Sequence, residues 1–298
     1  QFLNSDGGIE ADVTITRLDS DRFIIVTPAA TIQRDLNWIN RHIPDAAHCS
    51  ALDVTAMESV LVIMGPEARD FLQPLIPQSL ANADFPFGTM QNIEIGHGMA
   101  RAHRVSYVGE LGWELYVSSD QSVHVYDELI KRGQDHALAL CGLHTLDSCR
   151  IEKAFRHFGH DISSEDHILD AGLGFAARVN KQSGRFGDFI GRDAVIRRKE
   201  DGVKARMMQF RLNDAEPLLY HNEPIIRDGA IVSYLTSGNY GHHLGGAIGL
   251  GYVPCRDDND DAAAMLASEY VINVAGAEIT AQASLKPMYD PDASRMKA

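Results

Sequence analysis

A carboxylate near the start of the chain is the first candidate for chemistry. Asp12 lies within residues 9–17, where apolar and polar side chains alternate as in a half-buried strand. The alternation places Asp12 on the same face as Glu10, and like-charge repulsion between the two carboxylates could raise one pKa. A carboxylate with such a pKa can act as a general acid or base. A solvated polar strand face, which is the commoner case, fits the same pattern.

A second candidate group surrounds a glycine-containing turn over residues 108–112, between two predicted strands. Tyr107 precedes this turn and Glu114 follows it. In the second strand the alternation directs Glu114 and Tyr116 to one face and the apolar residues to the other. A carboxylate beside aromatic rings can recognise a flat heterocycle with N–H donors through two hydrogen bonds. A surface hairpin with an exposed glutamate is the alternative.

An arginine in a predicted helix is the third candidate. Arg150 lies close to an apolar side that includes Leu146 and Cys149, so we expect it to be half-buried and paired with a carboxylate. A structural ion pair, or a pair with Asp147 three residues earlier on the helix, is the alternative.

Other patterns that could carry chemistry are weak or missing. His157, His160 and Asp161 are metal-ligand types, but Gly159 is expected to end the helix between the histidines, so no metal site is predicted. The spacing of the four cysteines suits neither zinc nor a disulfide framework. The chain contains no Gly-x-Gly-x-x-Gly turn, phosphate-binding loop or Gly-x-Ser-x-Gly elbow, so a nucleotide-binding fold within it is not supported.

The composition of the 298 residues is that of an ordinary water-exposed domain, with 45% apolar and 23% charged residues. A net charge of −14 disfavours nucleic acid as a partner. No apolar run reaches the roughly 18–20 residues that a membrane span requires. We expect reduced, mostly buried thiols in a cytoplasmic compartment, or in the mitochondrial matrix if the source is eukaryotic.

The remaining pattern predicts an α+β part followed by a β-rich part, with a boundary near residue 203. The predicted domains are therefore residues 1–203 and 204–298. Further strands are expected over residues 22–27, 59–64, 99–106, 113–118, 205–212, 223–235, 246–253 and 269–285. Helices are expected over residues 30–43, 120–136, 144–158 and 192–200. Residues 159–190 are expected to be irregular, and the acidic residues 257–261 to form a solvated loop.

Several segments, in order, resemble the glycine cleavage T-protein (aminomethyltransferase) family, and together they span nearly the whole chain. Residues 4–12 resemble its Asn-Glu-x-Gly-Gly-Ile-x-x-Asp strand, and residues 104–115 contain its Tyr-x-Gly-Glu-x-Gly-x-Glu element. The other matching segments are residues 142–153, 189–194, 236–238 and 248–253. The resemblance implies a three-lobed, folate-binding aminomethyltransferase fold with a β-rich C-terminal lobe, N-terminally truncated at Gln1.

Within this family the chain is most similar to the C-terminal regions of dimethylglycine and sarcosine dehydrogenases. The features are the threonine-rich residues 12–18, the Tyr-Gly-His of residues 240–242 and the ending over residues 287–295. The resemblance implies transfer of a one-carbon unit to tetrahydrofolate, forming methylenetetrahydrofolate. This transfer would be coupled to FAD-dependent oxidative N-demethylation of a methylated glycine. The small-molecule methylated amine would react in a flavin domain outside this chain, in the same or a partner polypeptide.

The same resemblance assigns roles to individual residues. Asp12 would be the catalytic carboxylate near the reactive nitrogen of tetrahydrofolate. Glu114 and Arg150 would hold the pterin ring, with Tyr107 lining it and Phe175 as a further aromatic wall. Two departures from the family, Thr16 in place of a tyrosine and Phe175 in place of a tryptophan, would weaken folate affinity.

Two alternatives stay open. One is a folate-dependent demethylase that acts on another methyl donor without flavin. The other is a non-catalytic structural module of a flavoenzyme, in which Asp12 would not affect the products.

Overall fold

The structure, a computed structural model, describes residues 1–179, 188–257 and 260–298, which form two compact units. The first unit contains Gln1–Ser50 and Ala154–Tyr289, and the second contains Ala51–Lys153 and Asp290–Ala298. Each unit therefore combines segments that are far apart in the sequence. The division at residue 203 follows sequence order instead, and it stays a prediction.

The N-terminal part of the first unit consists of short elements. The predicted continuous strand over residues 9–17 is wrong, because β2 and β3 are separate strands with Asp12 and Val13 between them. Ile15, which lies on the apolar side of the predicted strand, is 52% exposed beyond this break. The elements are β1 (Phe2–Leu3), β2 (Ile9–Ala11), β3 (Thr14–Arg17), β4 (Phe23–Val26), α1 (Ile32–Arg41) and, much later in the chain, α5 (Arg192–Asp201).

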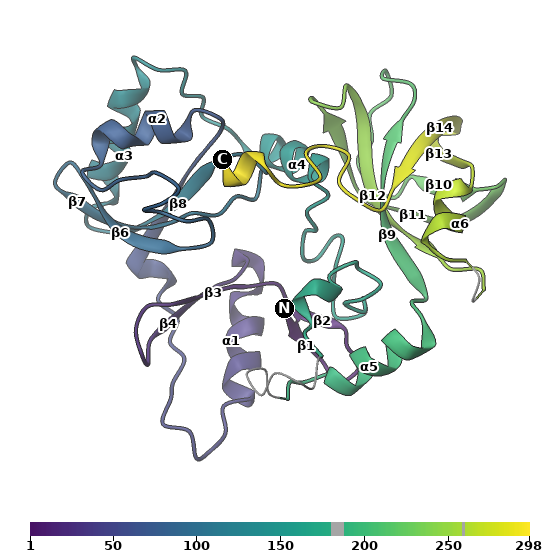
Figure 1. Ribbon diagram of the computed structural model, residues 1–298, viewed down its shortest axis with the longest axis horizontal. Helices are drawn as coiled ribbons and strands as arrows, with labels where there is room; N and C mark the ends of the chain where they lie inside the picture. The colour runs from purple at the N-terminus through teal and green to yellow at the C-terminus, as the bar shows by residue number, and fades with distance from the viewer. Residues whose placement is uncertain (180–187, 258–259) are drawn as a thin grey trace. The chain divides into compact units, whose positions relative to one another are not determined.

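The C-terminal part of the first unit is a closed antiparallel barrel, which confirms the predicted β-rich lobe (Figure 1). Its strand order is β10-β11-β12-β9-β14-β13. The strands are β9 (Ala205–Leu212), β10 (Pro224–Arg227), β11 (Ala230–Gly241), β12 (Gly246–Pro254), β13 (Tyr270–Val274) and β14 (Ala277–Ser284). Side chains such as Phe210, Leu235 and Ile272 fill the barrel interior.

Two long strands predicted in this region are hairpins. The predicted strand over residues 223–235 turns at Asp228 and Gly229, whose φ angles are 51° and 82°. The predicted strand over residues 269–285 turns at Ala275 and Gly276, with φ angles of 50° and 94°. Two successive residues with a left-handed backbone make a tight turn, and strand-forming residues continue directly on both sides of it. The run of strand-forming residues therefore did not reveal the turn.

The acidic residues 257–261 are not simply a solvated loop. Asp258 and Asn259 lie outside the described residues, but Asp260 is buried and accepts two hydrogen bonds from Arg227, at 2.5 and 2.6 Å. Asp261 caps helix α6 (Ala262–Ala267), which the sequence did not predict, by accepting from the N–H groups of Ala263 and Ala264.

The second unit is a four-stranded sheet with helices on one face. The strand order is β5-β8-β7-β6, and the antiparallel pairing of the predicted strands around residues 108–112 is confirmed. Strand β6 was not predicted, and the helix predicted over residues 144–158 ends earlier, at Glu152. The elements are β5 (Glu58–Met64), α2 (Ala68–Leu72), β6 (Met90–Ile95), β7 (Gly98–His103), β8 (Gly112–Ser118), α3 (Ser122–Gly133) and α4 (Leu143–Glu152).

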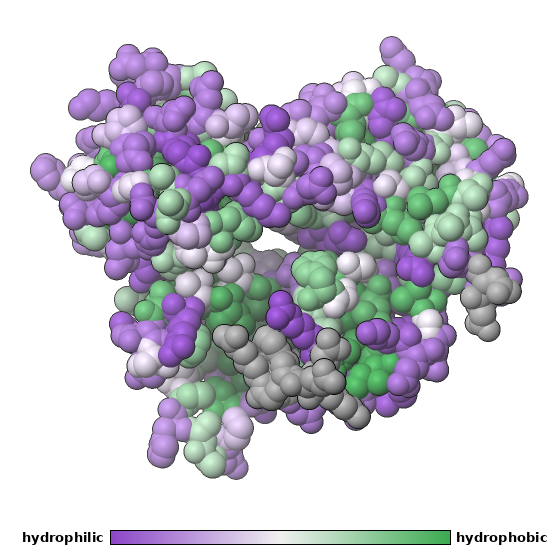
Figure 2. Space-filling model, in the orientation of Figure 1, coloured by the Kyte–Doolittle hydropathy of each residue, from purple (hydrophilic) through white to green (hydrophobic). Residues whose placement is uncertain are grey.

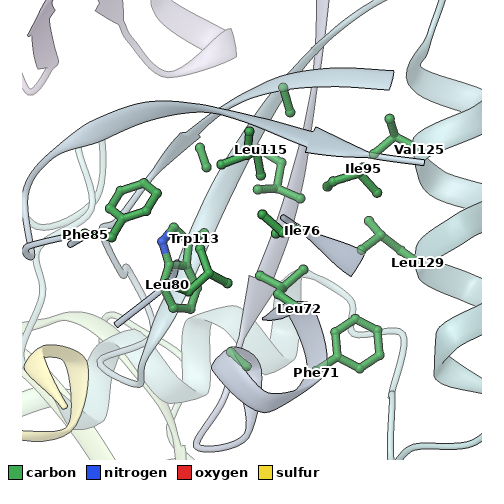
Figure 3. Close-up of a cluster of buried hydrophobic side chains, with 14 of the residues drawn as sticks. Phe71, Leu72, Ile76, Leu80, Phe85, Ile95, Trp113, Leu115, Val125 and Leu129 are labelled. Atoms are coloured by element: carbon green, nitrogen blue, oxygen red, sulfur yellow. The ribbon is translucent and has the colours of Figure 1, made fainter. Parts of the chain in front are cut away.

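The core of the second unit lies on one face of this sheet. Figure 3 shows Trp113 and Leu115 of β8 among side chains of α2 and α3, such as Leu72 and Leu129. The apolar run over residues 59–64 is typical of a strand buried on both faces, and it forms β5. Only one of its faces packs on this core, whereas Val60 and Val62 on the other face are 48% and 51% exposed.

Short 3₁₀ helices complete the description: η1 (Ala29–Thr31), η2 (Thr55–Met57), η3 (Gln73–Leu75), η4 (Gly174–Ala176) and η5 (Arg295–Lys297). Part of the stretch predicted to be irregular, residues 180–187, lies outside the described residues. The expectation of mostly buried thiols is wrong, because Cys49 and Cys141 are exposed and Cys149 and Cys255 are half-buried.

The face of the molecule that Figure 2 shows is mostly hydrophilic, with apolar residues scattered across it. Among the residues described by the structure, no helix combines the length and the apolar character needed to cross a membrane.

We expect the Arg227–Asp260 pair to make the stability of the first unit depend on pH in the acidic range. The hydrogen bonds from Arg227 lower the pKa of Asp260 to about 2. A lowered pKa means that the stabilisation is complete above the pKa of an unfolded aspartate, about 3.9, and is lost as the pH falls toward the folded value. Melting temperatures measured between about pH 5 and pH 2 should therefore fall less steeply for Asp260→Asn than for the wild type. Parallel curves for the two proteins would contradict this expectation.

Candidate functional site

Asp12 lies directly after β2, at the break between β2 and β3. Its carboxylate is half-buried, and its Oδ1 accepts a hydrogen bond of 2.7 Å from the Gln1 side chain. Burial is the main influence on this group and raises the pKa of Asp12, while Gln1 acts in the opposite direction. Asp12 therefore takes up a proton more readily than an ordinary aspartate, which suits a general acid or base.

The neighbouring carboxylate, Glu10, has a different role from the one predicted. Arg34 of α1 donates to both the carbonyl and the carboxylate of Glu10, so the negative charge is paired. The same guanidinium lies 5.3 Å from the ring centroid of Phe158. Burial, rather than repulsion from Glu10, accounts for the raised pKa of Asp12.

The turn that precedes β2 is organised by the side chain of Asn4. Its Oδ1 accepts from the N–H groups of Asp6 and Gly8 at 3.0 and 2.9 Å, and its Nδ2 donates to the carbonyl of Ser164 at 2.9 Å. A Cβ atom on Gly8 would overlap that same Ser164 carbonyl oxygen. The Asn-x-x-x-Gly pattern therefore brings two distant segments into contact and fixes the start of the strand that leads to Asp12.

Phe175 lies in η4 of the first unit, and 79% of its surface is exposed. Its predicted role as an aromatic wall for a ligand stays a prediction.

Glu114 lies on the face of the second unit's sheet that is opposite the apolar core. Trp113, Leu115 and Val117 are buried in the core on the other face, as the alternation predicted. The hydroxyl of Tyr116 donates a 2.5 Å hydrogen bond to Glu114 Oε2. The predicted shared face of Glu114 and Tyr116 is thereby confirmed.

A buried histidine that the sequence did not single out lies beside Glu114. His103 of β7 pairs with Glu114 across the strands and is only 4% exposed. Burial lowers the pKa of His103, although the charge of Glu114 acts in the opposite direction. Burial is the main cause that raises the pKa of Tyr116 well above its usual value, and the hydrogen bond to Glu114 is the second. At neutral pH the carboxylate is therefore flanked by a neutral imidazole and a neutral phenol.

Arg150 is more deeply buried than expected, with 3% of its surface exposed in α4. Its Nε donates to Asp147 Oδ1 at 2.9 Å, so the helical pair that the sequence left as an alternative is present. A contribution of Arg150 to ligand binding stays a prediction, because an ion pair of this kind is also structural.

Tyr107 is half-buried at the start of the turn between β7 and β8. Gly109, two residues later, has a φ angle of 79°, and a Cβ atom there would overlap the side-chain carbons of Lys153. Lys153 follows α4, and its Nζ donates to Asp290 Oδ2 at 2.9 Å. The glycine therefore lets the Tyr107 turn pack directly against the end of α4.

The predicted site residues divide between the two units. Asp12 and Phe175 belong to the first unit, and Tyr107, Glu114 and Arg150 belong to the second. Tyr116 and His103 are additional polar neighbours of Glu114. The alternation of β8 indicates Tyr116, but the register between β7 and β8 that brings His103 to Glu114 has no local signal in the sequence.

Comparison with known protein families gives two matches in order along the chain. Residues 1–181 match the GCVT N-terminal domain, and residues 206–290 match the glycine cleavage T-protein C-terminal barrel domain. A 4-methylaminobutanoate oxidase (formaldehyde-forming) from Paenarthrobacter nicotinovorans is 38% identical over 99% of this chain and 34% of its own length. The mitochondrial sarcosine dehydrogenase of Mus musculus is 30% identical over 99% of this chain and 33% of its own length. The chain thus spans about a third of the length of these curated relatives.

A solved structure confirms the predicted fold. The glycine cleavage system aminomethyltransferase T from Bartonella henselae superposes with a TM-score of 0.79 at 23% sequence identity. The match covers 97% of this chain and 74% of that one.

We expect Gly109→Ala to destabilise the second unit by at least about 1 kcal/mol, because a left-handed backbone and the overlap with Lys153 both oppose a methyl group. Gly142→Ala is the matched control, because the φ angle of Gly142 is −93° and no atom lies within 4 Å of the added Cβ. Urea unfolding of the two variants should separate them, and equal midpoints would contradict this account of the turn.

Proposed function

The chain belongs to the glycine cleavage T-protein family, and we propose that it is the folate-binding part of an enzyme that removes methyl groups from amines. In this proposal the one-carbon unit released from a methylated amine is transferred to tetrahydrofolate, forming methylenetetrahydrofolate. The observation that carries the proposal is the half-buried Glu114 carboxylate, held by Tyr116 on the sheet face opposite the apolar core.

The residues of the second unit fit a reduced pterin by their chemistry. A pterin edge presents adjacent N–H donors, and an ionised glutamate offers only acceptors, so Glu114 can bind two of these donors. Arg150 would contribute to the same pocket as a guanidinium with further donors, suited to a ring carbonyl. Tyr107 would supply an aromatic surface beside the ring.

Asp12 would carry the proton chemistry. Bound tetrahydrofolate would supply the nucleophilic nitrogen that takes up the one-carbon unit. Because burial raises the pKa of Asp12, its carboxyl can accept a proton from the attacking nitrogen and return it in the next step. This role requires no metal ligand from the chain.

The methylated substrate and the oxidation step are proposed from the relatives. One relative is named a formaldehyde-forming 4-methylaminobutanoate oxidase, which supports an N-methylated amino acid as substrate. Another is named a sarcosine dehydrogenase, which supports a methylated glycine such as dimethylglycine or sarcosine. FAD would accept two electrons from the N-methyl group in a domain outside this chain, of the same or a partner polypeptide. The carbon would then be at the oxidation level of formaldehyde, which tetrahydrofolate takes up without further redox chemistry.

Folate binding is tested by calorimetric titration of the full-length gene product with 5-formyltetrahydrofolate, a stable reduced folate. Loss of charge-assisted hydrogen bonds should make Glu114→Ala bind about 10- to 100-fold more weakly than the wild type. Glu94→Ala on β6 of the same sheet, where the side chain is exposed, should bind normally. Absence of binding by folded wild-type protein would overturn the proposal.

The role of Asp12 is tested by the products of sarcosine or dimethylglycine turnover. We expect Asp12→Ala to release formaldehyde in place of methylenetetrahydrofolate, with transfer about 100-fold slower or more, because a general acid–base group is lost. Asp6→Ala, an exposed carboxylate in the preceding turn, is the control. An unchanged product ratio would favour the non-catalytic module, and turnover of another methyl donor without flavin would favour the flavin-independent demethylase.

A further inference from the structure

The face of the second unit's sheet opposite the apolar core carries an ordered set of polar side chains. Strand register places Tyr116 of β8 opposite Arg101 of β7, and Glu114 opposite His103. Arg101 is paired with Glu58, which comes from β5 on the other side of β8. Each residue of this set therefore has a defined neighbour across the strands.

One contact in this set bears directly on Glu114. The Tyr116 hydroxyl donates to Glu114 Oε2 at 2.5 Å, which is the short distance typical of a hydroxyl bound to an ionised carboxylate. Tyr116 is 4% exposed, so its ring is held by packing and cannot follow a moving carboxylate. Because burial also raises the pKa of this phenol, it remains a donor at every physiological pH.

The other neighbours of Glu114, His103 and Arg101, do not hold its carboxylate in place. His103 lies directly opposite Glu114, but within the described part of the chain its buried Nδ1 has no hydrogen-bond partner. Arg101 is engaged by Glu58 and so does not pair with Glu114. The orientation of the Glu114 carboxylate thus depends on the Tyr116 hydroxyl.

We propose that Tyr116 is a positioning residue for ligand binding: its hydroxyl fixes the Glu114 carboxylate so that Oε1 is directed to an N–H donor of the ligand. Without this bond the half-buried glutamate would sample several rotamers, and binding would have to order it. The inference rests on the proposed function, since it takes the ligand to be the reduced pterin that Glu114 binds.

The test is calorimetric titration of the full-length gene product with 5-formyltetrahydrofolate, comparing the wild type with Tyr116→Phe. The variant retains the packed ring and loses only the hydroxyl, so we expect about tenfold weaker binding. Tyr270→Phe is the matched control. Tyr270 is equally buried and donates to the Met265 carbonyl at 2.9 Å inside the barrel, so its loss should affect stability and not affinity.

A double-mutant cycle separates positioning from a general structural effect. If Tyr116 acts through Glu114, its replacement by phenylalanine should change affinity less than about twofold when Glu114→Gln is already present. A tenfold loss in both backgrounds, or no loss in either, would overturn the inference.

The two proposals can fail separately. Absence of binding by the wild type would overturn the folate-binding function and this inference with it. Binding by the wild type that is lost in Glu114→Gln and unchanged in Tyr116→Phe would overturn the role of Tyr116 alone. Thermal unfolding of Tyr116→Phe and Tyr270→Phe, measured beside the titrations, identifies any variant that has not folded.

Discussion

Burial of one face of the four-stranded sheet is the constraint on which the candidate site in the second unit depends. Trp113, Leu115 and Val117 are completely buried against helices α2 and α3. Each such side chain contributes about 1.5–3 kcal/mol, more than the roughly 1 kcal/mol of an ordinary hydrogen bond. Since a slip of one residue would expose all three, the core determines the register, and the register places Glu114 and Tyr116 on the opposite face.

The surroundings of Asp12 combine an apolar cluster with directional polar contacts. Leu3 and Ile9 belong to a buried apolar cluster, and hydrogen bonds hold the backbone beside it. Asn4 binds the turn before β2, and Arg34 binds Glu10 at its carbonyl and its carboxylate. Asp35, which follows Arg34 in α1, is buried. Its carboxylate accepts a 2.6 Å hydrogen bond from the Thr31 hydroxyl, and this bond anchors the helix that carries Arg34. Geometry that rests on hydrogen bonds is directional, which fits the proton-transfer role proposed for Asp12.

The sequence predicted those features that depend on local periodicity. Strand β8 follows directly from apolar alternation, and so does the shared face of Glu114 and Tyr116. Features that depend on contacts between distant segments were missed. Predicting that His103 lies beside Glu114 requires knowledge of the register between two strands. Predicting that Asp260 is buried requires knowledge of its partner Arg227. The break at Asp12 was missed because β-forming residues continue on both sides of it.

The Arg101–Glu58 pair explains why Glu114 keeps its charge available. A half-buried carboxylate beside a free arginine would form an ion pair with it, and its acceptor sites would then be occupied. Arg101 has its own acid in Glu58, on the strand that flanks β8 from the other side. The neutral phenol of Tyr116 is left as the donor to Glu114, and a neutral donor orients a carboxylate without cancelling its charge. In the proposed function, the negative charge of Glu114 is thereby left for the N–H donors of the ligand.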